Sequence, residues 1–282
     1  MDRFLVAAYR PGDRPRVWLQ PRWAYMHAHP FVMRLDLSQI GIAEDHGHVV
    51  GVVHPEEHPA FCFLQAHPGT AVVKEALVDW ALHHLGGISQ SLGGEVIGIW
   101  VPDPDPGLDA ILTERGFAAT TQREPMAMRL LNRRLPSVIL PDGYRLHTLA
   151  EEDDIPEVNR VLWRGFDHEG PPPEDEIPGR IRMQHSPHFR RDLHAVVEDG
   201  AGAYVAYAGI WFDPINRVAC VEPVATDPEH RRRGLASAAI VEGLRRARAE
   251  GATVAWVGSD LPVYASLGFT VTCHKTLWVK RR

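Results

Sequence analysis

A turn that carries arginines and glycine is the segment of this chain best suited to binding an anion. It runs from Val224 to Ala236 and joins an apolar, strand-like segment to a helical one. Backbone N–H groups at a helix start lack intrahelical acceptors and lie at the positive end of the helix dipole, so several can donate to one phosphate. Gly234 allows close approach, and Arg231, Arg232 and Arg233 add positive charge. The pattern predicts a phosphate site, although adjacent arginines also occur at solvated helix starts.

Two common phosphate motifs do not fit this turn. A P-loop needs a Lys-Ser/Thr pair after its last glycine, and here Leu235 and Ala236 occupy those positions. The three-glycine spacing of a dinucleotide-binding turn is also missing from the segment. A turn that binds pyrophosphate but has no groups for hydrolysis is suited to binding coenzyme A.

A second motif follows the helix. The apolar segment Val254–Val257 ends in small polar residues that include Ser259, and then come Tyr264, Gly268 and Phe269. Together the two segments resemble the GNAT superfamily of acyl-CoA-dependent N-acyltransferases. Its Arg/Gln-x-x-Gly-x-Gly/Ala signature is matched by Arg231, Gly234 and Ala236, and its Tyr-x-x-x-Gly-Phe signature by Tyr264, Gly268 and Phe269. The resemblance implies acetyl-CoA as cofactor and an α/β (α+β) fold in which helices flank a mixed, mostly antiparallel sheet.

The segments beside the motifs predict the elements that position them. Ala203–Trp211 and Arg217–Thr226 are apolar runs that predict a hairpin leading into the turn. Leu235–Arg248 predicts a helix that ends near Gly251, with an apolar face formed by Ile240, Leu244 and Ala247. Thr270–Val279 is rich in β-branched and aromatic residues and predicts two closing strands. From residue 138 onward we expect helices, strands, turn, helix, strand, short helix and strands.

The chain length and an internal repeat predict two related domains. At 282 residues the chain exceeds a usual single domain, and the segment 133–143, with two prolines and a turn signal, is the best boundary. Glu95–Val101 followed by Ile111–Phe117 mirrors Val254–Val257 followed by Val263–Phe269. We therefore expect a tandem GNAT arrangement, with a degenerate GNAT-like domain at 1–134 and a catalytic GNAT domain at 138–282. An accidental likeness of two small α/β domains is the alternative.

The first copy lacks the residues that would do chemistry. Phe61–Leu64 and Val72–Leu82 fall where the second copy has its strand and long helix, but the segment 66–70 replaces the arginine turn. Leu112 stands in the place of Tyr264, and a leucine cannot donate a proton. We expect this copy to have a structural or substrate-shaping role.

The resemblance implies roles for individual residues of the second copy. Strand Val221–Thr226 would lie along the pantetheine arm. Pro223 cannot donate a backbone hydrogen bond, which fits a break in the ladder or an edge. The implied coenzyme-binding residues are Val224, Ala225, Thr226, Arg231, Arg232, Arg233, Gly234, Leu235, Ala236 and Ser259. Ser259 is equally well explained as a cap of the following short helix.

Two side chains are the candidate catalytic groups. Tyr264 would protonate the departing thiolate, since a phenol near pKa ~10 can serve a thiol near ~8.5, a match that burial is expected to improve. Strand alternation puts Glu222 on one face with Val224 and Thr226, so its carboxylate is the candidate general base; a salt bridge and a water base are the alternatives. Cys220 shares that face, but nothing in the sequence activates it, so we expect direct attack in a ternary complex and no acyl-enzyme.

Composition limits the partners. Lys+Arg of 30 against Asp+Glu of 36 makes nucleic-acid binding unlikely to be the function. No apolar run approaches a membrane span. Three cysteines cannot form a disulfide framework, which favours a cytoplasmic protein. The paired histidines, such as His27 and His29, lack accompanying cysteines, so we expect no metal site.

The acceptor is expected to be a small primary amine. An acidic, proline-stiffened loop follows Trp163 and Phe166 and contains Glu174, Asp175 and Glu176. In the family this region borders the acceptor site, where carboxylates would attract a cationic amine, as surface solvation would also explain. Trp163, Phe166 and Trp211 are candidate pocket walls or core residues. A coenzyme A sensor without catalysis and a protein N-terminal or lysine acetyltransferase remain alternatives, and the protein is expected to be a monomer or homodimer.

Overall fold

The computed structural model describes residues 1–282 except 13, 16, 57, 68 and 69. The chain forms two compact units. Unit 1 contains Met1–Gln20, Arg34–Met126 and Val271–Arg282, and unit 2 contains Pro21–Met33 and Ala127–Thr270. Each unit therefore includes a segment from the other side of the boundary expected near residues 133–143. The division into domains 1–134 and 138–282 stays a prediction. Within the described residues, no helix has the length and apolar character needed to span a bilayer.

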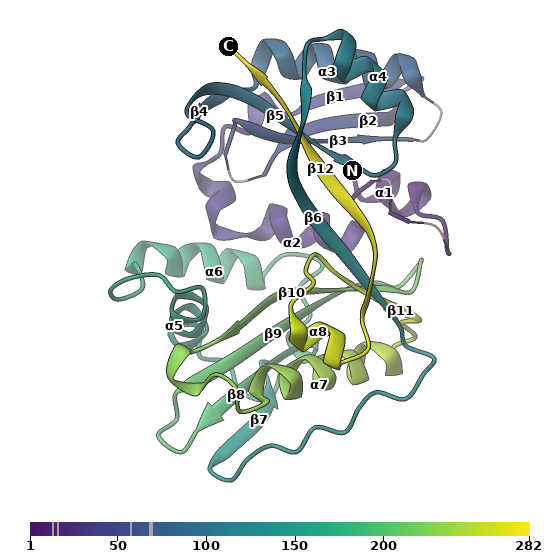
Figure 1. Cartoon of the computed structure of the whole chain (residues 1–282). Coiled ribbons are helices and arrows are strands. Elements are labelled where there is room, and N and C mark those ends of the chain that lie inside the picture. Colours follow the sequence, from purple (N-terminus) through teal and green to yellow (C-terminus); the bar gives the residue numbers. More distant parts are fainter. Residues whose placement is uncertain (13, 16, 57, 68–69) are drawn as a thin grey trace. The chain divides into compact units, whose positions relative to one another are not determined.

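Unit 2 is a sheet with helices on both faces (Figure 1). The strand order is the end of β6, then β11, β10, β9, β8 and β7, and of these only β10 and β11 pair in parallel. Its strands are β6 (Ala118–Leu130, shared with unit 1), β7 (Tyr144–Thr148), β8 (His194–Asp199), β9 (Tyr204–Asp213), β10 (Val218–Thr226) and β11 (Val254–Val257). Its α-helices are α2 (Gln20–Ala28, from Pro21), α5 (Ile155–Gly165), α6 (Ile177–Gln184), α7 (Leu235–Ala249) and α8 (Pro262–Ser266), with 3-10 turns η1 (Pro30–Arg34), η3 (Glu174–Glu176), η4 (Arg191–Leu193) and η5 (Pro228–His230).

Helix α7 matches the expected helix closely. Ile240, Leu244 and Ala247 are fully buried against the face of β9 that carries Ala206, Ala208 and Ile210. The helix can approach the sheet because a Cβ added at Gly243 would lie 2.5 Å from the Ile210 side chain. After the helix, Gly251 takes a left-handed φ of 103° and donates to the Arg248 carbonyl, which ends it. The helix fixes the turn that precedes it.

Unit 1 has the same kind of architecture. Its strand order is β1, β2, β3, β5, β12 and the first part of β6, with β4 beside β5. β3 and β5 pair in parallel, whereas the pairs β1–β2, β2–β3, β4–β5 and β5–β12 are antiparallel. The strands are β1 (Gly41–Asp45), β2 (His48–Pro55), β3 (Phe61–Ala66), β4 (Gly87–Ser89), β5 (Gly94–Pro102) and β12 (Thr270–Arg281, from Val271). The helices are α1 (Asp2–Ala8), α3 (Ala71–His84), α4 (Pro106–Glu114) and the 3-10 turn η2 (Leu37–Gln39). The mixed, mostly antiparallel sheet expected for both copies is confirmed.

The two units share a detailed hydrogen-bond pattern where their short helices end. In unit 2 the N–H of Phe269 donates to the Tyr264 carbonyl at 3.0 Å, and in unit 1 the N–H of Phe117 donates to the Leu112 carbonyl at 2.9 Å. The preceding glycines, Gly268 and Gly116, have left-handed φ values of 83° and 80°. Leu112 therefore occupies the position of Tyr264, as the repeat predicts, and it is fully buried.

Two expectations about the second half were wrong. Thr270–Val279 was expected to form two strands, but β12 is one continuous strand from Thr270 to Arg281, because no glycine or proline interrupts it. The second half was expected to start with helices, yet β7 precedes α5. Only five residues long, β7 gives a weak pattern that includes one arginine and one histidine. Of the segment 66–70, residues 68 and 69 lie outside the described residues.

Candidate functional site

The parallel strands of unit 2 diverge and leave an edge of backbone exposed. β10 pairs with β11 from Val218 to Cys220, opposite Val254 to Trp256. Beyond Cys220, β10 continues to Thr226 paired with β9 alone, within the residues that the structure describes. The backbone groups of β10 that point away from β9 are therefore available to an extended ligand that adds to the sheet as a further strand.

A bulge bends β10 at the point of divergence. The register against β9 shifts between Val221, opposite Ile210, and Val224, opposite Ala208, so β10 contains one extra residue there. This is the ladder break expected at Pro223. The bulge brings the Glu222 carbonyl close to β9, and a Cβ at Gly209 would lie 2.7 Å from that oxygen. Glycine at 209 is thus required by close packing.

The turn after β10 presents a row of backbone donors. Arg232 and Gly234 have left-handed φ values of 61° and 79°, and Gly234 is the N-cap of α7. Left-handed residues in such a turn curl successive amides toward one point, the geometry of an anion-binding nest. The backbone N–H groups from Arg232 to Ser237 have no acceptor among the described residues, whereas Ala238 donates to the Gly234 carbonyl at 3.0 Å. These N–H groups can donate to an anion.

The three arginines of this turn have different surroundings. The Arg231 guanidinium donates to the carbonyls of Thr226 at 3.2 Å and Gly165 at 2.9 Å, and to Asp167 at 2.8 Å, so it braces the turn against the end of α5. Arg233 donates to the Tyr144 hydroxyl at 2.6 Å. Arg232 is exposed and makes no side-chain hydrogen bond within the described residues. Of the three side chains, Arg232 is therefore the one whose donors are uncommitted.

Asp227 holds the start of the turn, and the sequence analysis missed it. Its side chain is almost fully buried; it accepts from Arg164 at 2.5 and 2.9 Å and from the Glu229 N–H at 3.1 Å. Burial alone would raise the pKa of Asp227, but the hydrogen bonds from Arg164 and the Glu229 amide lower it. The Asp-Pro pair at the start of η5 was the signal for this cap.

Tyr264 lies in the core at the beginning of the exposed edge. Its side chain is 7% exposed, and its ring packs edge-on against Phe269 at 5.9 Å between centroids. Its hydroxyl has no hydrogen-bond partner in the described part of the chain. Burial, and then the nearby Glu222 and Cys220, raise the pKa of Tyr264 above its ordinary value. The expectation that burial would bring this pKa closer to that of a thiol was wrong, because burial disfavours the phenolate.

Glu222 is paired with a residue far away in sequence. Arg22 of α2 donates to the Glu222 carboxylate, and both side chains are about a quarter exposed, at 22% and 27%. The salt bridge that was the alternative for Glu222 is thus present. It uses one carboxylate oxygen, and the second oxygen can still accept a proton or a hydrogen bond. Sequence reasoning missed Arg22, which lies 200 residues away, because nothing local marks it.

The remaining candidates fall in two groups. Cys220 lies 3.9 Å from the Glu222 carboxylate, and burial, then Glu222, raises the pKa of its thiol, which opposes a nucleophilic role. Ser259 accepts from the Leu261 N–H at 3.3 Å, but Leu261 is itself the N-cap of α8 and that helix has no side-chain cap, so the capping alternative is not what the structure shows. Trp163 donates to the Gly170 carbonyl, and Phe166 is 53% exposed, whereas Trp211 is fully buried. Among the described residues, all three cysteines are free and buried.

Comparison with known proteins shows what this part of the chain is similar to. Residues 155–269, which contain the splayed strands, the turn and Tyr264, match the acetyltransferase (GNAT) family. This part of the chain is a GNAT acetyltransferase domain. The mycothiol acetyltransferase of Nocardia farcinica (strain IFM 10152) is 25% identical over 251 residues, covering 81% of this chain and 78% of that protein. The predicted resemblance to the GNAT superfamily is confirmed, and both matches are to acetyltransferases, which supports an acetyltransferase enzyme.

Solved structures show a similar fold over most of the chain. A tandem GNAT protein from the clavulanic acid biosynthesis pathway has a TM-score of 0.63 at 17% identity, covering 99% of this chain and 93% of its own. A GCN5-related N-acetyltransferase from Sphaerobacter thermophilus has a TM-score of 0.62 at 16% identity, covering 88% and 84% of the two chains. At these identities the likeness concerns the fold.

Unit 1 has a cavity where its own pair of parallel strands diverges. β3 and β5 pair in parallel only from Phe61 to Phe63, opposite Gly98 to Trp100, and then diverge. Between their ends lies a cavity of about 280 Å³ lined by Leu64, Ala66, Thr70, Ala71, Lys74, Pro102, Asp105, Pro106, Gly107 and Leu108. Inside it, Lys74 and Asp105 form an ion pair of 2.5 Å whose side chains are 11% and 15% exposed. A carboxylate here opposes diphosphate binding, consistent with a degenerate copy.

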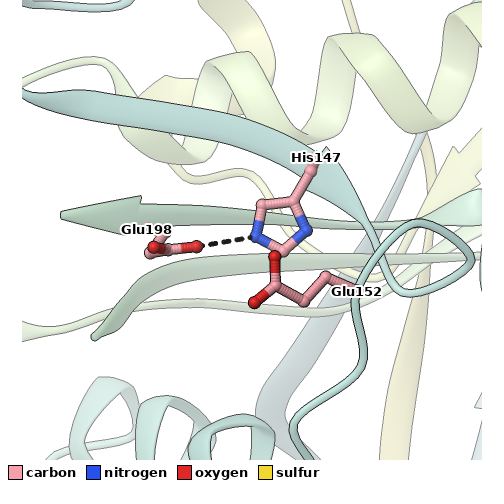
Figure 2. Close-up of side chains that lie close together, drawn as sticks. All are labelled: His147, Glu152 and Glu198. Carbon is pink, nitrogen blue, oxygen red and sulfur yellow. Dashed lines mark ion pairs between the residues drawn. The ribbon is translucent and has the colours of Figure 1, made fainter. Parts of the chain in front are cut away.

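One group in unit 2 has the residue types of a metal site. The ligand atoms of His147, Glu152 and Glu198 lie within 4.8 Å of one another, and Figure 2 shows the three side chains converging, with His147 beside Glu198 at 3.2 Å. Arg145, however, donates to both Glu152 and Glu198 at 2.5 Å. Its guanidinium already occupies both carboxylates and offsets one of their two negative charges, so the group is best described as an ion-pair network.

Proposed function

We propose that the protein transfers an acetyl group from acetyl-CoA to a primary amine of a small molecule, by direct attack within a ternary complex. The observation that carries the donor assignment is the run of backbone N–H groups without acceptors from Arg232 to Ser237 at the start of α7. It lies directly after the unpaired edge of β10, so one ligand with a diphosphate and an extended amide-bearing arm would use both features. Coenzyme A has those two parts.

The residues proposed to hold coenzyme A follow from this placement. Val224, Ala225 and Thr226 would pair with the pantetheine arm through their backbone, and the amides of Gly234, Leu235 and Ala236 would donate to the diphosphate. Arg232 would add its charge, Arg231 and Arg233 would brace the turn, and Ser259 would lie near the arm. The thioester would then lie at the bulge, between Glu222 and Tyr264.

Each step of the transfer has a group to assist it. The acceptor must lose a proton before it attacks, and Glu222 would accept that proton directly or through a water, with Arg22 holding its carboxylate in place. The neutral nitrogen attacks the thioester carbonyl, the C–S bond breaks, and Tyr264 would protonate the thiolate. The second proton that the nitrogen loses as the amide forms would restore the Tyr264 hydroxyl. Burial raises the pKa of Tyr264, so the phenol stays protonated and keeps a proton to give to the departing thiolate. The similarity to a mycothiol acetyltransferase favours a small-molecule acceptor.

The donor site can be tested with one charge placed at either end of α7. Ala236→Glu puts a carboxylate in the first turn, where an acidic residue favours the helix but repels a diphosphate. Ala249→Glu puts the same charge on the exposed last residue of α7, ~20 Å away. Titration calorimetry with coenzyme A should show binding at least about 10-fold weaker for Ala236→Glu and little change for Ala249→Glu.

Two results would contradict the proposal. If Ala236→Glu binds coenzyme A as tightly as the parent, the helix start is not the diphosphate site. If the parent binds acetyl-CoA but releases no thiol with any amine of a broad panel, including peptide amines, acetyl transfer to a small amine is not its activity.

A further inference from the structure

A group of buried polar side chains in unit 2 has no part in the acyl-transfer scheme. It comes from α2, α6, β8 and β9, and each member is at least nine-tenths buried. The members are Tyr25, Arg180, His194, Tyr207 and Trp211, with exposed fractions of 6%, 8%, 0%, 2% and 0%. Burying polar groups costs free energy unless they form hydrogen bonds. A group of this kind is therefore expected to have hydrogen-bond partners, from the protein or from a ligand.

Hydrogen bonds inside the group leave several donors without acceptors. The Tyr207 hydroxyl lies 2.5 Å from His194 Nδ1, but His194 Nε2 and Trp211 Nε1 have no hydrogen-bond partner among the described residues. The Tyr25 hydroxyl likewise makes no hydrogen bond to the described residues. The group therefore contains more polar atoms than it satisfies internally.

Arg180 is the charged member, and its guanidinium is only partly engaged. Nε donates to Asn159 Oδ1 at 3.0 Å, and the Glu176 carboxylate lies 3.7 Å from one terminal nitrogen, beyond hydrogen-bond distance. The terminal nitrogens make no hydrogen bond to the described residues. Burial lowers the pKa of Arg180, and Tyr25 and Glu176 oppose that shift. A planar guanidinium with a free edge is suited to a bidentate carboxylate.

The group lies next to the proposed acyl-transfer residues. Trp211 pairs with Cys220 across the β9–β10 ladder, and Gly209 packs against both the Glu222 carbonyl and the His194 ring, at 2.7 and 3.0 Å from its Cβ position. After burial, the charges of Glu222, Arg22 and Arg180 have the largest influence on the pKa of Tyr25. The phenol is therefore close enough to the Arg22–Glu222 pair and to Arg180 to respond to the charges of both.

We propose that Arg180 and Tyr25 bind a carboxylate of the acceptor, which makes the acceptor an amine that also carries a carboxylate. Its nitrogen would lie at Glu222 and its carboxylate would receive two hydrogen bonds from the free edge of Arg180 and one from Tyr25. A monoanion fits better than a phosphate dianion, because Glu176 already contributes one negative charge 3.7 Å from Arg180. This inference rests on the proposed function and specifies its substrate class.

The test compares acceptors that differ only in the carboxylate. Thiol release from acetyl-CoA is measured with L-α-amino acids, β-alanine and γ-aminobutyrate, each beside its carboxamide, and with O-phosphoethanolamine. For the best carboxylate acceptor we expect kcat/KM about 10- to 100-fold above that of its amide, mainly through KM, as for a hydrogen-bonded charge pair. Arg180→Gln should abolish this preference, and Arg180→Lys should retain part of it.

A matched control comes from the same helix. Arg182 is exposed and donates to the carbonyls of Ala28 and His29 at 3.3 and 3.2 Å, so Arg182→Gln removes the same charge without touching the buried group. It should keep the preference for the carboxylate. If Arg180→Gln does not fold, the comparison of acid and amide with the parent protein still decides the inference.

Other outcomes separate this inference from the proposed function. Acetylation of amides as efficiently as of acids, a preference that survives Arg180→Gln, or O-phosphoethanolamine as the better substrate would overturn the carboxylate assignment while leaving the acetyltransferase activity in place. Absence of turnover on every amine would contradict the proposed function. In that case calorimetric titration of the coenzyme A-bound protein with β-alanine and its amide decides the inference: tighter binding of the acid supports it, and equal or no binding overturns it.

Discussion

Replacing Tyr264 with phenylalanine should remove the proposed acid and little else. The aromatic contact with Phe269 and the burial of the ring are both available to phenylalanine. Because the hydroxyl has no hydrogen-bond partner among the described residues, no buried group loses one. We therefore expect the free energy of unfolding of Tyr264→Phe to stay within about 0.5 kcal/mol of the parent.

The expected loss of rate follows from general acid catalysis. A positioned acid contributes roughly 10²- to 10⁴-fold. Burial and then Glu222 raise the pKa of Tyr264, which makes it a weaker acid, so we expect the lower end of that range. A loss of about 100-fold in kcat corresponds to ~2.7 kcal/mol in activation free energy. The raised pKa also keeps the phenol protonated, so its ionisation should not lower kcat of the parent below pH ~10.

The assay follows thiol release at saturating acetyl-CoA and amine, together with urea unfolding of each variant. Tyr204→Phe is the matched control, because Tyr204 is also buried and its hydroxyl donates to the Glu152 carbonyl at 3.3 Å, away from the bulge in β10. This control should lose about 1 kcal/mol of stability and keep its kcat. If kcat of Tyr264→Phe stays within about 3-fold of the parent, Tyr264 is not the acid and a water protonates the thiolate.

Two further predictions follow from buried groups of unit 2. Cys220→Ala should keep kcat within about 3-fold of the parent and show no acyl-enzyme by mass spectrometry, since burial raises the pKa of this thiol; trapped acetyl-Cys220 would contradict direct transfer. Burial lowers the pKa of His194 to about 3, so protonation favours the unfolded chain below its ordinary pKa near ~6.5. The free energy of unfolding, measured with urea, should fall by about 2 kcal/mol between pH 6.5 and 5. His194→Asn should lose this part of the pH dependence, and a variant with the pH dependence of the parent would refute the assignment to His194.

Local patterns in the sequence predicted the elements of the donor site. The arginine turn, α7 with its buried Ile240 and Leu244, and the ladder break at Pro223 each follow from neighbouring residues. They could be predicted because each depends on residues that are close together in the sequence. Helix periodicity, the missing N–H of a proline and a glycine after arginines are all local features. The assignment of β12 failed where local composition could not distinguish one long strand from two.

The acceptor side of the site could not be predicted in this way. Arg22 pairs with Glu222 over 200 residues, and Arg22 and Tyr25 belong to the same unit as Glu222 only because α2 is part of unit 2. Arg180 comes from α6, which is separate in sequence from both α2 and β10. In sequence, Arg180 follows an acidic loop, a setting typical of a solvated helix. Its burial and its free guanidinium edge depend on tertiary packing, and those two properties are what point to a carboxylate.

The two units also show why duplication of the fold does not duplicate the proposed chemistry. Both have parallel strands that diverge beside a helix start, β3 and β5 in one unit and β10 and β11 in the other. In unit 2 that space is bordered by unpaired amides after Arg232, whereas in unit 1 it holds the Lys74–Asp105 ion pair at 2.5 Å. A diphosphate entering unit 1 would have to displace Asp105 from Lys74 and from the Leu108 N–H that it caps. That displacement leaves a poorly solvated carboxylate without partners, a cost that the helix dipole of α3 alone does not offset.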